Sequence, residues 1–146
     1  MALRKLSRED TQAFLERAPG LLGVVGTLGA DGYPHLVAVW YRYDGERIFI
    51  WTLEKRTWVQ NAVRDDRVAF SVQEEAGESR GVSIKGRAKI ATGDDEWIQE
   101  EIRRITRRYV TEQAEIEPYI HAWQRLRTIV TLTPEGIHAW YDEPEG

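Results

Sequence analysis

The feature that most constrains the fold is a run of three predicted strands joined by two Asp-Gly turns in the first third of the chain. Residues 21–28 (LLGVVGTL) form an apolar run typical of a buried strand, and residues 34–43 (PHLVAVWYRY) are predicted as the returning strand. The turns fall at residues 30–33 and 44–46, because aspartate followed by glycine favours a tight turn between antiparallel strands. With residues 47–52 as the third strand, the segment predicts an antiparallel meander.

The elements around this segment alternate between short helices and further strands. A helix is expected to open at Ser7, with Asp10 as its capping-box partner, and to end at Pro19-Gly20. The pattern then predicts a helix at 55–64, a strand at 67–73, a polar loop at 74–79 and a strand at 81–92.

A longer amphipathic helix follows, with isoleucines and a tyrosine at helical intervals from residue 98 to residue 109. Thr92 and Asp95 are interpreted as the capping box that opens it. Its first turn is acidic and its last two turns are basic, as the helix dipole favours. The basic side chains are therefore interpreted as a solvated face; they are Arg103, Arg104, Arg107 and Arg108.

The end of the chain is predicted as one helix and a hairpin. Pro118 starts the helix (residues 118–126), because proline fits the first helical turn. Residues 127–132 and 137–141 are predicted as two strands joined by a turn at 134–136. The whole pattern gives about seven strands and three or four short helices. It predicts a mainly β protein, a closed or nearly closed antiparallel β-barrel with peripheral helices.

Composition narrows the class of protein. A chain of 146 residues suits one domain, taken here as residues 1–146. A formal net charge of −4 argues against nucleic-acid binding, which needs a basic face. The absence of cysteine excludes disulfides, thiolate nucleophiles and cysteine-ligated metals within this sequence.

No apolar run approaches the ~20 residues of a membrane helix. The first residues also lack a secretory signal pattern, so a cytoplasmic protein is expected.

Few side chains suit acid–base or metal chemistry. The three histidines, His35, His121 and His138, have no partner at the spacing of a metal motif, so no metal site is predicted. No serine lies in a nucleophile elbow, and the acidic residues cluster in turns and helix starts. No catalytic side chain is therefore assigned. Such a chain can still be an enzyme if a cofactor carries the chemistry.

The junction WTLEKRTWVQN (residues 51–61) is the strongest candidate for a ligand site. Two cations, Lys55 and Arg56, and two hydroxyls, Thr52 and Thr57, lie where a strand gives way to a helix. Backbone N–H groups at a helix start favour a phosphate, and the cations would neutralise it. A solvated polar turn explains the same residues equally well. Six tryptophans in so short a chain also suit a flat ligand or a subunit interface.

The order of these pieces resembles the pyridoxamine 5′-phosphate oxidase-like superfamily of split-barrel flavin and deazaflavin oxidoreductases. The resemblance covers residues 20–92 best and includes the patterns T-x-x-x-D-G-x-P-H and N-x-x-x-D-x-R-V. The matching segments are GVVGTLGADGYPHLVAVWY (23–41), DGERIFIWT (44–52), RTWVQNAVRDDRVAFSV (56–72) and VSIKGRAKI (82–90).

The resemblance implies an FMN-binding type of split barrel and a homodimer with two cofactor sites at the subunit interface. It implies FMN or the deazaflavin coenzyme F420 as cofactor, with a preference for F420, and a small-molecule substrate. The second strand would line the ring, the 51–57 junction would meet the phosphate, and Lys85 and Arg87 would reach toward the partner's site. The cofactor-binding residues so implied are His35, Val37, Ala38, Val39, Trp51, Thr52, Lys55, Arg56, Thr57, Trp58, Asn61 and Lys85.

Two positions depart from the family pattern. Trp58 stands where many relatives carry a phosphate-binding lysine, and Ala38 stands where many carry proline. Trp58 is interpreted as a core residue, with stacking on a ring as the alternative. The leading hypothesis is an FMN- or F420-dependent oxidoreductase that transfers hydride to a small organic acceptor, and not a true pyridoxamine phosphate oxidase. The alternatives are a non-catalytic flavin, haem or tetrapyrrole binding protein, and a retained fold whose cofactor site is lost.

Overall fold

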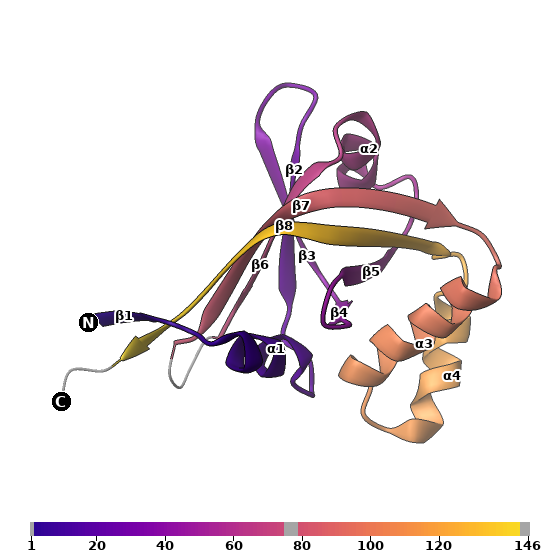
Figure 1. The fold of residues 1–146 in the computed structure, drawn as a ribbon. Coiled ribbons are helices and arrows are strands. Elements are labelled where there is room, and N and C mark those ends of the chain that lie inside the picture. Colours follow the sequence, from indigo (N-terminus) through magenta and orange to yellow (C-terminus); the bar gives the residue numbers. More distant parts are fainter. Residues whose placement is uncertain (1, 75–78, 144–146) are drawn as a thin grey trace.

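Eight strands form one strongly bent antiparallel sheet in a computed structural model that describes residues 2–74 and 79–143 (Figure 1). Helices pack around the sheet, which confirms the predicted mainly β split barrel with peripheral helices. Most of the polar loop expected at 74–79 lies outside the described residues. The strands are β1 (Ala2–Lys5), β2 (Gly23–Leu28), β3 (Pro34–Val39), β4 (Tyr41–Tyr43), β5 (Ile48–Thr52), β6 (Arg67–Gln73), β7 (Gly81–Thr92) and β8 (Thr128–Glu143). The helices are α1 (Arg8–Glu16), α2 (Thr57–Arg64), α3 (Glu96–Tyr109) and α4 (Gln113–Ala122).

The expected meander is wrong, because the second strand breaks at Trp40. Its halves, β3 and β4, lie at opposite ends of the strand order β3-β2-β6-β7-β8-β5-β4. Both Asp-Gly turns are confirmed, with Gly32 and Gly45 at positive φ. They connect two separate hairpins, β2–β3 and β4–β5, so that β3 and β5 do not pair. The sheet therefore curls without closing fully, and the break at Trp40 lies at the split.

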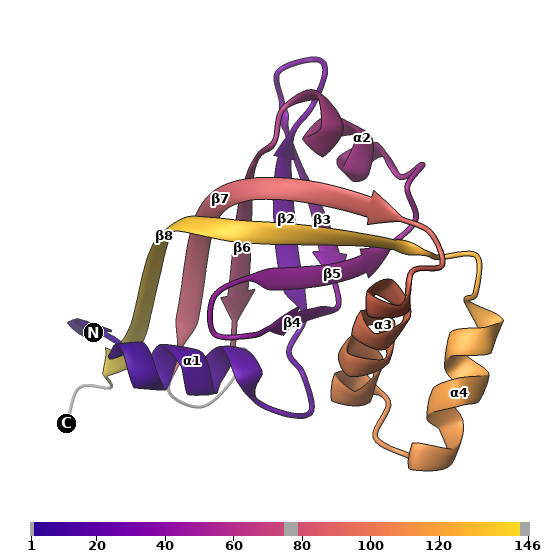
Figure 2. The ribbon, with the colours of Figure 1, turned by 45° about the vertical axis from the view of Figure 1, so that its right-hand side comes forward.

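The predicted C-terminal hairpin is also wrong, because β8 is one continuous strand along the whole of β7 (Figure 2). The register places Gly86 opposite Pro134 and Lys85 opposite Gly136, so Glu135 is the extra residue of a β-bulge. A Cβ at Gly86 would overlap the Thr133 carbonyl oxygen, so glycine permits this close approach. The Pro-Glu-Gly sequence therefore bends the strand instead of reversing it.

Strand β1 was not predicted. Its four residues, ALRK, are too few for a periodic pattern, yet β1 pairs with the last residues of β8, from Ala2 opposite Glu143 to Lys5 opposite Trp140. The two ends of the described chain consequently lie side by side (Figure 1).

The core consists of two clusters on opposite faces of β5. Ile48 and Ile50 face the barrel interior, where they join the larger cluster. Phe49 belongs to a second cluster on the outer face, together with the isoleucines of α3 and with Trp51 packed against it. Strand β5 is therefore buried on both faces, which explains its continuous apolar sequence.

The helix boundaries partly follow the predicted signals. Ser7 caps α1 as expected, because its hydroxyl accepts a hydrogen bond from the Asp10 amide at 3.0 Å. The capping box at Thr92 is wrong, since this residue ends β7 and its hydroxyl lies 2.8 Å from that of Thr128. Pro118 does not start a helix but lies inside α4. It is exposed, so water can satisfy the carbonyl that loses its helical partner.

The solvated arginine face of α3 is only partly confirmed. Arg104 and Arg107 are exposed beside Glu100. Arg108 is buried, and its guanidinium donates hydrogen bonds to the backbone carbonyls of Tyr41, Leu15 and Arg17. The basic end of α3 thus ties this helix to β4 and α1. Among the described helices, none has the length and apolar character needed to cross a bilayer.

Candidate functional site

The junction between β5 and α2 forms an uncapped, cationic helix start. Arg56 is the N-cap residue and makes no side-chain capping bond. Its carbonyl accepts from the amides of Val59 and Gln60 at 3.0 and 3.1 Å, as the first turn of a helix requires. Lys55 and Arg56 are exposed, and neither forms an ion pair or a side-chain hydrogen bond within the described part of the chain. The first amides of α2 and two free cations are therefore available to an anion.

A pocket of about 320 Å³ opens beside this helix start. The end of β3, the end of β5, the start of α2 and the segment around the end of α4 each contribute to its wall. The predicted site residues that the structure brings together here are Val37, Ala38, Val39, Trp51, Thr52, Arg56 and Trp58. These residues come from β3, β5 and α2, and the fold brings them to one pocket. Their binding of a cofactor stays a prediction.

The remaining predicted residues lie outside the wall of this pocket. Lys55 and Thr57 flank Arg56 and are exposed. His35 is half-buried farther along β3, opposite Thr27. Lys85 is exposed on β7, between Ala69 of β6 and Gly136 of β8 in the sheet.

Asn61 is held in a buried network of its own. Its amide donates to the Thr27 hydroxyl at 3.1 Å, and its side-chain oxygen accepts from Arg64 at 3.1 Å. In this conformation the Asn61 side chain fastens α2 to β2.

Trp58 is 2% exposed and belongs to the barrel core, as its interpretation as a core residue predicts. It also lines the pocket. The side chain that replaces the expected lysine therefore contributes an apolar surface where a relative would offer a charge.

A wall of stacked aromatic side chains closes the pocket on the α4 side. The Trp40 ring lies between Tyr109, with centroids 4.6 Å apart, and Tyr119, with centroids 5.3 Å apart. Tyr119 also contacts Trp51 edge-on at 6.3 Å and Trp123 at 6.4 Å. Burial raises the pKa of the Tyr119 hydroxyl above its ordinary value of 10.0, so the hydroxyl stays protonated at neutral pH.

Sequence reasoning missed the part of this wall that α4 supplies. Tyr119 and Trp123 are four residues apart, so a helix through both would have placed them on one face. The predicted helix at 118–126 contained both residues, but no pattern in the sequence showed that this helix packs beside the strand ends that form the pocket. The predicted strand at 34–43 ran through Trp40, so the break of the strand at this residue was not predicted.

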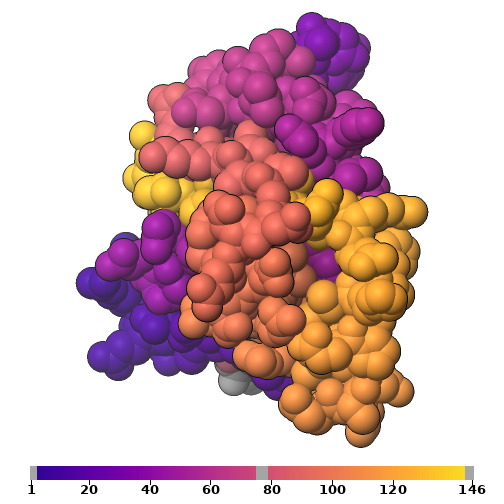
Figure 3. Space-filling model, turned by 90° about the vertical axis from the view of Figure 1, so that its right-hand side faces the viewer, coloured from indigo at the N-terminus to yellow at the C-terminus, as the bar shows by residue number. Residues whose placement is uncertain are grey.

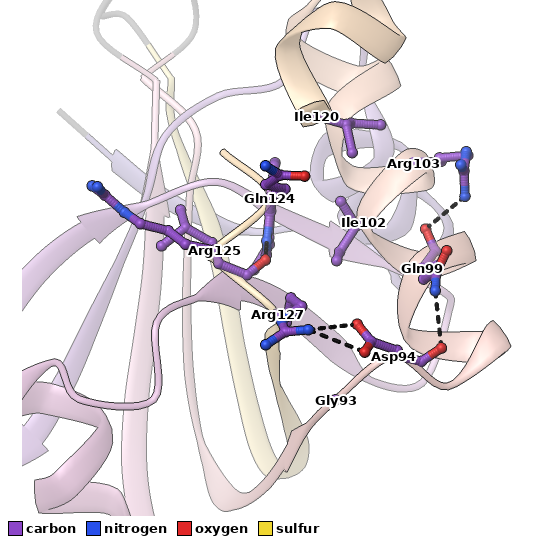
Figure 4. A pocket seen from close by; sticks show the side chains of 11 residues that line it. Gly93, Asp94, Gln99, Ile102, Arg103, Ile120, Gln124, Arg125 and Arg127 are labelled. Carbon is purple, nitrogen blue, oxygen red and sulfur yellow. Dashed lines mark hydrogen bonds and ion pairs between the residues drawn. The ribbon is translucent and has the colours of Figure 1, made fainter. Parts of the chain in front are cut away.

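A second pocket, of about 410 Å³, lies on the other side of Trp51 and Leu126, which line both pockets. It is bounded by α3, α4 and the segment between α4 and β8 (Figure 4). The Trp51 indole N–H donates a hydrogen bond to the Leu126 carbonyl and so links β5 to the segment after α4. Figure 3 shows α3 and α4 side by side on this face of the molecule.

The chain matches a known family over most of its length. Residues 7–141 match the family model described as pyridoxamine 5′-phosphate oxidase. An F420H(2)-dependent biliverdin reductase from Mycobacterium tuberculosis is 31% identical over 103 residues, which cover 70% of this chain and 72% of the relative.

Two solved structures show the same fold. The conserved hypothetical protein Rv2991 from Mycobacterium tuberculosis aligns with a TM-score of 0.79 and 28% identity, over 93% of this chain and 85% of that one. A structure described as an F420 reductase aligns with a TM-score of 0.66 and 24% identity, over 86% of this chain and 94% of that one.

Proposed function

Because the chain belongs to the pyridoxamine 5′-phosphate oxidase family, which includes flavin- and deazaflavin-dependent oxidoreductases, we propose that it is an oxidoreductase that uses F420 or FMN, with F420 preferred. In this proposal hydride passes between the cofactor and a small organic acceptor. The observation that carries the proposal is the aromatic-walled pocket that opens at the uncapped, cationic start of α2.

The residues of the pocket fit both ends of such a cofactor. A flat ring suits a wall built from Trp40, Trp51, Tyr119 and Trp123 against the backbone of β3. A phosphate suits the first amides of α2 together with Arg56 and the neighbouring Lys55. When bound, the cofactor supplies the hydride chemistry. The protein residues hold the ring, exclude water from it and neutralise the phosphate.

One observation favours F420 over FMN. The 31% identical relative is described as F420H(2)-dependent, and it shares about seven-tenths of its length with this chain. Biliverdin, named for that relative, is the first acceptor to test.

The proposal includes a homodimer with the cofactor at the subunit interface. The outward face of the β2–β3 hairpin carries large apolar side chains exposed to solvent: Leu22, Val24, Leu28, Tyr33 and Leu36. Leu36 is 69% exposed, and β3 is an edge strand of the sheet. A contiguous apolar face of this kind is typical of a protein interface. Light scattering on the purified protein tests this part of the proposal, and a Leu36→Glu variant should be monomeric.

The test of the proposed function is a titration of the purified protein with FMN and, separately, with F420. Trp51, Trp58 and Trp123 line the pocket, so ring binding should quench tryptophan fluorescence. We expect tighter binding of F420. Replacing Lys55 and Arg56 together by alanine should weaken binding by about 1–3 kcal/mol, as for lost charged hydrogen bonds.

The matched control is the double variant Lys89→Ala with Arg104→Ala, which removes the same two residue types from exposed positions on β7 and α3. It should bind as the unsubstituted protein does. Absence of binding to either cofactor would contradict the proposal.

A non-catalytic flavin, haem or tetrapyrrole binding protein is the alternative on the same fold. Protein loaded with reduced F420 distinguishes the two functions when it is mixed with biliverdin. If the protein speeds the oxidation of reduced F420 by biliverdin, the enzyme is supported. If the protein binds F420 and no acceptor tried oxidises the bound cofactor, the alternative is supported.

A further inference from the structure

We propose that the second pocket, between α3, α4 and the segment 124–127, binds an apolar molecule that carries a carboxylate, and that it serves as the substrate side of the cofactor pocket. The assignment of the ligand as substrate rests on the proposed function. The chemistry of the ligand follows from the pocket itself.

The interior of the second pocket is apolar. Ile102 projects from α3 and Ile120 from α4 toward the same space, while Trp51 and Leu126 form the side shared with the cofactor pocket (Figure 4). Its volume of about 410 Å³ falls in the range of small-molecule sites, roughly 300–1,000 Å³. A ligand therefore needs an apolar body to occupy it.

The rim of the second pocket is cationic. Arg103, Arg125 and Arg127 line it, with Asp94 as the acidic residue of the lining. Arg127 is bound to Asp94 through contacts of 2.9 and 3.0 Å, and Arg103 is bound to Glu117 at 2.8 Å. Both pairs are solvent-exposed, and such pairs contribute little stability, so an incoming carboxylate can compete for either arginine.

Arg125 lines the second pocket and also lies close to a residue of the cofactor pocket. Its stem lines the second pocket, and its guanidinium lies 5.6 Å from the ring centroid of Trp123, which lines the cofactor pocket. It forms no ion pair with any carboxylate in residues 2–74 and 79–143. Figure 4 shows its side chain extending away from Ile102 and Ile120. A carboxylate that reaches from the second pocket toward Trp123 would therefore meet a guanidinium that has no competing acid in residues 2–74 and 79–143.

The two pockets are adjacent, because Trp51 and Leu126 line both of them. The indole of Trp51 and the backbone of Leu126 separate them, and a single hydrogen bond joins these two groups. In this proposal the apolar body of the substrate lies between α3 and α4, and its carboxylate meets Arg125, whose guanidinium lies beside Trp123 of the cofactor pocket.

Three probes that share one ring system test this assignment without any cofactor: 1-naphthaleneacetate, its neutral amide and 2-(1-naphthyl)ethylamine. Calorimetric titration should give an affinity for the acid about tenfold above that for the amide, with the amine weakest. The indole N–H resonance of Trp51, assigned with a Trp51→Phe variant, should shift on binding of the acid, because this group borders the pocket.

Two variants test the position of the ligand. Arg125→Gln should lower the affinity for the acid about tenfold and leave that for the amide unchanged, while Arg104→Gln, on the exposed face of α3, should change neither. Ile120→Trp should fill the pocket and abolish binding of the acid. The same Ile120→Trp protein should keep its affinity for F420 or FMN, because Ile120 does not line the cofactor pocket.

Equal affinities for the acid and the amide, or an acid affinity that survives both Arg125→Gln and Ile120→Trp, would overturn the inference. These outcomes are independent of the cofactor titration. Failure of the proposed function appears as no binding of F420 or FMN, and failure of this inference appears in the naphthyl series alone.

Discussion

Two groups of cations in this protein have opposite surroundings. Lys55 and Arg56 at the start of α2 are exposed and have no acidic partner among the described residues. Arg108 at the end of α3 is buried and contacts three backbone carbonyls, and Arg42 on β4 contacts the buried carboxylate of Glu101 through two hydrogen bonds.

The difference shows which charges serve the fold and which are free for a ligand. A buried guanidinium has lost its hydration, so it must be satisfied by protein acceptors, and its loss leaves those acceptors unsatisfied. An exposed cation without a partner contributes little to folding and remains available to an anion. The charges that matter for stability and those that matter for binding should therefore be separable by substitution.

The largest effect is expected for Arg108→Ala. The substitution leaves the carbonyls of Tyr41, Leu15 and Arg17 without their donor and opens a void between α3, α1 and β4. We expect a loss of about 3–5 kcal/mol in the free energy of unfolding, measured by urea titration with fluorescence detection. A loss below about 1 kcal/mol would show that water replaces the guanidinium at no great cost.

A smaller effect is expected for Glu101→Gln. The Glu101 side chain is 5% exposed, and the change leaves Arg42, which is 20% exposed, without its countercharge. Because Arg42 can still reach water, we expect a loss of about 2–3 kcal/mol in the same measurement. Glu100→Gln is the matched control one residue away, where the side chain is 44% exposed. It should change stability by no more than about 0.5 kcal/mol. Equal losses from both would contradict the distinction between buried and exposed pairs.

The double variant Lys55→Ala with Arg56→Ala should have a free energy of unfolding within about 0.5 kcal/mol of that of the unsubstituted protein, because neither side chain has a partner in residues 2–74 and 79–143. The same protein should show the weakened cofactor binding expected above. A large loss of stability would mean that these cations serve the fold. The comparison with Arg108 would then fail.

The last effect concerns the stability of the protein at acid pH. Hydrogen bonds from Arg80 at 3.1 Å and from Arg17 at 2.8 Å lower the pKa of Glu74 to about 2, from its ordinary value of 4.5. Because the folded-state pKa is lowered, the contribution of Glu74 is complete above pH 4.5 and is lost as the pH falls toward 2. Glu74→Gln should make the urea midpoint less dependent on pH in this window. An unchanged slope would contradict the pairing.

Much of the fold follows from local patterns. The Asp-Gly turns at 30–33 and 44–46, the Ser7 cap and the strand at 67–73 all occur where the sequence predicts them, since each depends on dihedral preferences and periodicity within a few residues. The junction at 51–57 was identified in the same way, as cations and hydroxyls beside a helix start. Its use by a cofactor remains the subject of the titration.

The rest depends on contacts between distant segments. Nothing within ten residues of Pro134 shows that β7 lies alongside and converts an apparent turn into a bulge. Arg108 looks like its exposed neighbours until Leu15, 93 positions away, presents a carbonyl to it. Tyr119 and Trp123 became part of a pocket only because α4 packs against Trp40 and Trp51.

Local patterns therefore account for the turns, most of the strands and the cationic helix start. Packing between distant segments sets which strands pair, which charge is buried and which aromatic side chains form the pocket wall. Backbone preference is a property of a short stretch of chain. Burial and hydrogen-bond satisfaction, in contrast, are set by whatever the completed fold brings alongside.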